Sequence, residues 1–148
     1  MGAICDMRLL VINPTSTATM TTKIGAAARA AAGAGTDILA INPKGTPVSI
    51  EGYYDEALSV PGMLEIIRTT SDFNAVIIAC FDDTGLDAAR SLTDRPVIGI
   101  GEAAYHFACM LANKFSVVTT LARSVPALEH NLHRYGMAAR CARVRSSE

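Results

Sequence analysis

The chain has 148 residues, of which 50% are hydrophobic, and its 13 basic and 14 acidic side chains leave a formal net charge of −1. This length fits one domain, or one lobe and part of another, and the apolar content excludes an intrinsically disordered chain. The balanced charge argues against a nucleic-acid binder, which normally carries a basic excess. Segment 1–6 lacks the regions of a signal peptide, and no apolar stretch approaches the roughly 18 residues of a membrane-spanning helix. We therefore expect a cytoplasmic protein that binds neither nucleic acid nor a membrane.

Apolar runs of strand length alternate along the chain with longer segments of helical composition. The expected strands are 8–12, 36–41, 75–79, 96–100, 115–119 and 141–144, and the expected helices are 20–32, 57–70, 86–92, 103–112 and 125–135. Continuous apolar strands that alternate with helices predict an α/β fold with a doubly wound parallel sheet and right-handed crossovers. Segments 8–15 and 115–120 share the order of strand and polar turn. This approximate internal symmetry predicts a first lobe over 7–113 and the start of an incomplete second lobe over 114–148.

The residues that follow the expected strands are the first candidates for a binding site, because ligands bind beyond the carboxyl ends of the strands in open α/β sheets. Most of these residues are polar, and their hydroxyl and amide groups suit a small ligand that is neutral or singly charged. Each of them could instead serve as a turn former or a helix cap. The candidates for substrate binding are Asn13, Pro14, Thr15, Thr17, Phe81, Asp82, Thr119 and Thr120.

The four cysteines form no CxxC pair and no tight disulfide framework, so free thiols in a reducing compartment are expected. Cys80 is the candidate for catalysis, because it follows a buried strand and precedes an expected helix start. The other cysteines, Cys5, Cys109 and Cys141, lie in the amino-terminal segment, within an expected helix and at the start of the last strand.

The expected surroundings of Cys80 include groups with opposite effects on the ionisation of its thiol. Thr84 and Asp87 resemble a capping box that would open a helix at Gly85, and the helix end would favour the thiolate. Asp82 and Asp83 would oppose ionisation if they faced the thiol. We expect Cys80 to be the most readily alkylated thiol, and the alternative is a small buried hydrophobic residue.

Two further patterns suggest a cofactor or a metal but fit poorly. Residues 99–104 match the dinucleotide fingerprint G-x-G-x-x-A, yet no acidic residue follows the next strand to bind a ribose. His106 with Cys109, and His130 with His133, have an i,i+3 spacing that could present two ligands to one metal. These pairs lie on separate expected helices, away from the strand ends. We therefore expect neither a cofactor nor a metal.

Four blocks of sequence, taken in order, resemble the hydantoin racemase branch of the aspartate/glutamate racemase superfamily. They are VINPTS at 11–16, IACFDDTGL at 78–86, PVIGI at 96–100 with Glu102 and Ala103, and FSVVTT at 115–120. The resemblance implies two α/β lobes that clasp a small-molecule substrate and supply one cysteine each. One thiolate removes the α-proton and the other thiol protonates the opposite face, without metal, flavin or pyridoxal phosphate. Cys80 matches the first family cysteine, and Asn13, Thr119 and Thr120 match substrate-contacting strand ends.

The chemistry of cysteine fits this resemblance, because a thiol with a pKa of about 8.5 can act as an acid or a base near neutral pH. The developing oxyanion needs donors, which the Phe81 backbone N–H, Asn13 and the Thr119/Thr120 pair could supply. The resemblance places the second cysteine beyond residue 148, whereas Cys141 lies at the start of a strand.

The resemblance therefore implies a racemase of 5-substituted hydantoins, or of a cyclic ureide such as allantoin. Because the strand that ends at Val144 would leave a strand edge and apolar helix surface uncovered, we also expect a homo-oligomer. We expect this chain to be truncated and to show little activity. Two alternatives are an arylmalonate-type decarboxylase, which needs one proton donor, and a non-catalytic fragment.

Overall fold

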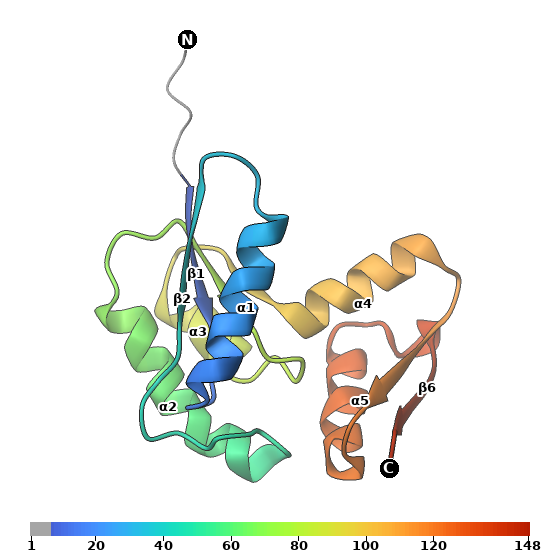
Figure 1. Ribbon diagram of the computed structural model, residues 1–148. Helices are drawn as coiled ribbons and strands as arrows, with labels where there is room; N and C mark the ends of the chain where they lie inside the picture. Colours follow the sequence, from blue (N-terminus) through green and yellow to red (C-terminus); the bar gives the residue numbers. More distant parts are fainter. Residues whose placement is uncertain (1–6) are drawn as a thin grey trace.

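The protein is built on two parallel β-sheets with helices packed against them (Figure 1), and the computed structural model describes residues 7–148. The first sheet has the order β2-β1-β3-β4, and the second pairs β5 with β6. The strands are β1 (Met7–Ile12), β2 (Thr36–Ile41), β3 (Ala75–Ile78), β4 (Val97–Gly99), β5 (Phe115–Thr119) and β6 (Cys141–Ser146). Every strand pairing is parallel, which confirms the expected α/β class. The expectations for Cys5 and segment 1–6 fall outside the described residues.

The helices connect the strands in an order that decides which face of the first sheet each one covers. They are α1 (Ala18–Ala31), α2 (Tyr53–Thr69), α3 (Leu86–Leu92), α4 (Ile100–Leu111) and α5 (Val125–Arg134), with 3-10 turns at Ala122–Ser124 and Ala138–Arg140. The chain passes from β1 outward to β2, then back across β1 to β3 and on to β4. Right-handed crossovers therefore put α1 on one face and both α2 and α3 on the other.

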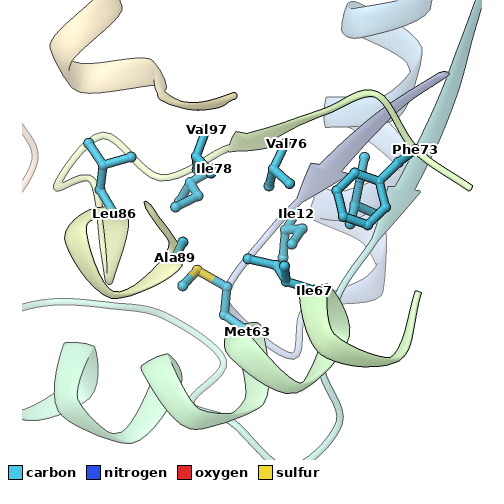
Figure 2. Close-up of a cluster of buried hydrophobic side chains, with 10 residues drawn as sticks. Ile12, Met63, Ile67, Phe73, Val76, Ile78, Leu86, Ala89 and Val97 are labelled. Atoms are coloured by element: carbon cyan, nitrogen blue, oxygen red, sulfur yellow. The ribbon is translucent and has the colours of Figure 1, made fainter. Parts of the chain in front are cut away.

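The core of the first sheet lies between its strands and the helices α2 and α3 (Figure 2). Ile12 of β1 and Val76 and Ile78 of β3 are completely buried, and they meet Met63 of α2 and Leu86 of α3. Burial of a large aliphatic side chain contributes about 1.5–3 kcal/mol, so this layer holds the two helices on the sheet. The strand ends that carry the site are thereby fixed in position.

The second sheet has a core of its own, to which α4 contributes. Tyr105 of α4 packs with Val117 of β5 and with Leu128 and Leu132 of α5. The Arg140 guanidinium closes the carboxyl end of α4 by donating to the carbonyl oxygens of Cys109, Ala112 and Asn113 at 3.0, 2.7 and 2.6 Å. A cation that satisfies carbonyls left unpaired at a helix end also interacts favourably with the helix dipole.

The expected and observed elements agree closely, and the largest differences lie at helix starts. The range 86–92 for α3 and the ranges of β2 and β5 are confirmed, whereas α2 begins at Tyr53, four residues earlier than expected. The Asp55 carboxylate accepts the backbone N–H of Glu51 at 3.0 Å, next to this early start. Across the described residues, no helix combines the length and hydrophobicity that a membrane crossing requires.

Candidate active site

Cys80 begins the loop 80–85, which leads from β3 into α3. The Thr84 hydroxyl donates to Cys80 Sγ at 3.3 Å, and the backbone N–H groups of Asp82 and Thr84 also face the sulfur. The Asp83 N–H donates to the Cys80 carbonyl at 3.0 Å and closes the turn. Three donors therefore surround the sulfur, an arrangement that would stabilise a thiolate formed there.

Burial nevertheless raises the pKa of the Cys80 thiol. The hydrogen bond from Thr84 lowers this pKa and the Asp82 charge raises it further, so burial decides the balance. Helix α3 begins at Leu86, as expected, but the groups that act on this pKa lie in the loop before it. The thiol is thus protonated at neutral pH, and the reason for expecting unusually fast alkylation of Cys80 is removed.

The capping box expected at Thr84 and Asp87 is wrong. Helix α3 has Gly85 as its N-cap, in a left-handed conformation with φ 67°, and no side chain caps it. The Thr84 hydroxyl is instead directed to Cys80, and Asp87 pairs with Arg134. A hydroxyl four residues after Cys80 was the available signal for this role, but the same hydroxyl also fitted a cap.

Asp83 is a buried carboxylate that joins the loop to the start of α4. Its Oδ1 accepts the backbone N–H of Gly101 at 2.9 Å, and its Oδ2 accepts that of Glu102 at 2.7 Å. An anion at a helix amino end satisfies unpaired N–H groups and interacts favourably with the helix dipole. Helix α4 therefore begins at Ile100, directly after β4, and three residues earlier than expected.

The two glycines of the apparent dinucleotide fingerprint make room for this carboxylate. A Cβ at Gly99 would overlap the Asp83 carboxyl group, and a Cβ at Gly101 would overlap the Phe81 carbonyl oxygen and lie 2.8 Å from Asp83 Oδ2. Glycine in such motifs permits close approach of an anion to a helix amino end. Here the anion is a side chain of the same protein, so the pattern has a structural explanation.

The loop after β1 lies beside the Cys80 loop, because β1 and β3 are neighbours and the Ala79 N–H donates to the Ile12 carbonyl at 2.8 Å. The buried Asn13 amide donates to the Thr17 carbonyl at 3.3 Å and to Thr21 Oγ1 at 3.0 Å, while its oxygen accepts from Thr15. These bonds shape the loop from within. Donation by Asn13 to a substrate stays a prediction.

The remaining candidates around this loop differ in exposure. Pro14 and Thr15 are buried, whereas Thr17 is partly buried and its hydroxyl donates to the Val48 carbonyl at 2.6 Å. Phe81 is 37% exposed and packs edge-to-face on Tyr105, with 5.5 Å between ring centroids. Phe81 is thus accessible beside Cys80.

Thr119 and Thr120 come from the second sheet, at the end of β5. The Thr119 carbonyl accepts the Ser147 N–H at 2.8 Å, and Thr120 is exposed. Figure 1 shows the strands of both sheets running toward the lower side of the view, so their carboxyl ends face the same side. Contact of these two threonines with a substrate stays a prediction.

A cavity of about 180 Å³ lies next to the Cys80 loop, between α2, α3 and α5. Glu56 and Asp82 line it together with His130 and Arg134. Burial, with the nearby charges of Glu56 and Asp83, raises the pKa of Asp82 to about 6. Asp82 thus titrates close to neutral pH.

Across residues 7–148, no three metal-binding side chains come together, so neither His106 with Cys109 nor His130 with His133 has a third such side chain beside it.

Comparison with known proteins places this arrangement in a family. The model for the Asp/Glu/Hydantoin racemase family matches residues 9–148. A hydantoin racemase of Pseudomonas sp. (strain NS671) is 47% identical over 95% of this chain and 57% of its own length. A hydantoin racemase of Rhizobium meliloti is 48% identical over 95% of this chain and 59% of its own length.

Solved structures agree with these sequence matches. An allantoin racemase from Klebsiella pneumoniae superimposes with a TM-score of 0.92 at 48% identity, and the match covers 95% of this chain and 58% of that one. An allantoin racemase from Pseudomonas fluorescens gives a TM-score of 0.92 at 38% identity, covering 95% and 60%.

The fold is thus that of an α/β protein of the racemase class. The chain belongs to the Asp/Glu/Hydantoin racemase family and spans somewhat under two thirds of the length of the relatives it matches.

Proposed function

We propose that the protein takes part in racemisation of 5-substituted hydantoins or of a related cyclic ureide such as allantoin. In this proposal Cys80 transfers a proton at one face of the α-carbon. The observation that carries it is the position of Cys80 in a racemase-family chain, at a strand end with three donors around its sulfur. The relatives named hydantoin racemase and allantoin racemase support this substrate class.

Proton transfer at the α-carbon proceeds through a planar, enolate-like intermediate, which needs a base on one face and an acid on the other. Since burial raises the pKa of Cys80, the protonated thiol predominates near neutral pH and is ready to donate. Abstraction requires the thiolate, which the Thr84 hydroxyl and the loop N–H groups would stabilise as it forms. We therefore expect abstraction by Cys80 to accelerate as the pH rises.

In this proposal the chain contributes to two lobes, and residues of both lobes contact the substrate. Residues 7–113 form a first lobe, and residues 114–148 belong to a second. The loop after β1, with Phe81 and Asp82, lines the substrate from the first lobe. Thr119 and Thr120 approach it from the second, where hydroxyl donors could stabilise the oxyanion.

Hydrogen exchange at the α-carbon tests the role of Cys80. One enantiomer of 5-benzylhydantoin, and separately of allantoin, is incubated with the protein in deuterated buffer while mass and optical rotation are followed. We expect deuterium uptake above the protein-free rate, lost in Cys80→Ala and retained in the matched variant Cys109→Ala. Retained rotation would indicate exchange at one face, and lost rotation would indicate a second acid.

Two results would overturn the proposal. One is equal exchange by the wild-type protein and Cys80→Ala, and the other is no exchange above the protein-free rate with either substrate. Release of carbon dioxide from an arylmalonate would instead favour the decarboxylase, which the names of the matching relatives do not favour.

A further inference from the structure

Three contacts connect α5 and the residue after it to the segment that follows Cys80. They join residues that lie far apart in the sequence, and they link the second sheet's helix to the loop 80–85 and to α3. Asn131 Nδ2 donates to the Asp82 carbonyl at 2.8 Å, Tyr135 Oη donates to Asp83 Oδ2 at 2.7 Å, and Arg134 Nη1 donates to Asp87 Oδ2 at 2.5 Å.

The contact between Tyr135 and Asp83 is partly buried, and its direction is defined. Arg134 Nη2 donates to the Tyr135 oxygen at 2.6 Å, so the phenolic hydrogen is free to point at Asp83. Asp83 is only 2% exposed, and its carboxylate also accepts the two backbone N–H groups at the start of α4. Hydrogen bonds to a buried carboxylate are charge-assisted and therefore stronger than those between neutral groups.

Asp83 in turn contacts the segment that surrounds the thiol. Its N–H donates to the Cys80 carbonyl, and the next residue, Thr84, donates to Cys80 Sγ. Asp83 has φ 52°, in the left-handed region, which is disfavoured for residues with a Cβ and persists where surrounding contacts fix it. A shift of the Asp83 carboxylate would therefore move both groups that hold Cys80.

We propose that Tyr135 and Asp83 are positioning residues that hold the loop 80–85 in place around the half-buried Cys80 thiol. Helix α5 and the residue after it thereby control how far the thiol is open to water and to substrate. The inference rests on the proposed function only for its relevance to catalysis, because the alkylation rate of the thiol measures directly whether the loop is in place.

The test is alkylation of the full chain by iodoacetamide over a range of pH, with peptide mapping of each cysteine. Tyr135→Phe removes the hydroxyl and keeps the ring that packs against both cores, and Tyr54→Phe at an exposed position is the matched control. Loss of one hydrogen bond to a buried carboxylate should raise the alkylation rate of Cys80 near neutral pH by roughly tenfold.

The same experiment separates loop opening from general loosening. Opening exposes the thiol to water, so the pH midpoint for Cys80 should fall toward that of an ordinary cysteine, while alkylation of Cys109 and Cys141 stays unchanged. Asp83→Asn removes the charge that three donors share and should shift Cys80 further than Tyr135→Phe. Tyr54→Phe should match the wild type.

Two results would overturn the inference. One is a Cys80 profile in Tyr135→Phe that superimposes on the wild-type profile, and the other is parallel acceleration of Cys80, Cys109 and Cys141. If the alkylation profile shifts as expected but deuterium exchange is absent, the positioning role holds and the proposed function fails.

Discussion

Replacement of Gly101 by alanine tests whether the close approach of the Asp83 carboxylate, rather than helix propensity, explains the need for glycine at this position. Gly101 is the second residue of α4, and alanine is favoured over glycine within a helix by about 1 kcal/mol. On propensity alone, Gly101→Ala would stabilise the protein. The structure predicts the opposite sign, because the new methyl group would overlap the Phe81 carbonyl oxygen and lie 2.8 Å from Asp83 Oδ2.

The size of the effect follows from what must move. The Phe81 carbonyl belongs to the backbone and cannot rotate away, so either the loop or the start of α4 must shift. Overpacking of this kind costs about 1–3 kcal/mol. Weakening a hydrogen bond between Asp83 and the helix end would add about 1.5–3 kcal/mol. Since propensity offsets about 1 kcal/mol of this, we expect a net loss of about 1.5–5 kcal/mol in the free energy of unfolding.

Urea unfolding followed by circular dichroism measures this difference. Gly33→Ala is the matched control, because a Cβ at Gly33 meets nothing within 4 Å. We expect the control to lie within about 1 kcal/mol of the wild type, and Gly101→Ala to unfold at a clearly lower urea concentration with a similar m-value. A Gly101→Ala variant as stable as the wild type, or more stable, would refute the reasoning.

Two further predictions concern a helix end and a buried acid. Arg140→Ala leaves the last carbonyl oxygens of α4 without their cation, and we expect a loss of about 1–3 kcal/mol in urea unfolding. The exposed Arg143→Ala is the control, and an equal loss in both variants would contradict this role. Asp82 binds its proton more tightly in the folded protein, with a pKa of about 6, than in the unfolded chain. Its contribution to stability is therefore present at low pH and lost as the pH rises through about 6. In Asp82→Asn, the free energy of unfolding measured with urea should fall less as the pH rises through about 6. An unchanged pH dependence would contradict the assignment.

The order of strands and helices could be predicted from the sequence because it depends on local spacing. Runs such as 36–41 and 115–119 are apolar and of strand length, and the structure places β2 and β5 at those ranges. The position of Cys80 at a strand end followed from the same local pattern. Helix starts were harder to predict, since α4 begins where a distant carboxylate accepts its first N–H groups.

The sequence by itself determined the α/β class, the family resemblance and the candidate cysteine, because each is encoded in short ordered segments. Only the tertiary structure decided the state of the thiol, since burial outweighs the donors around Cys80. It also decided the role of Thr84, which resembled part of a capping box, and the role of the two glycines, which matched a nucleotide fingerprint that lacked its acidic partner. The contact between Tyr135 and Asp83 joins residues 52 positions apart. Such contacts depend on how the two sheets and their helices pack together, and the spacing of residues along the chain does not predict that packing.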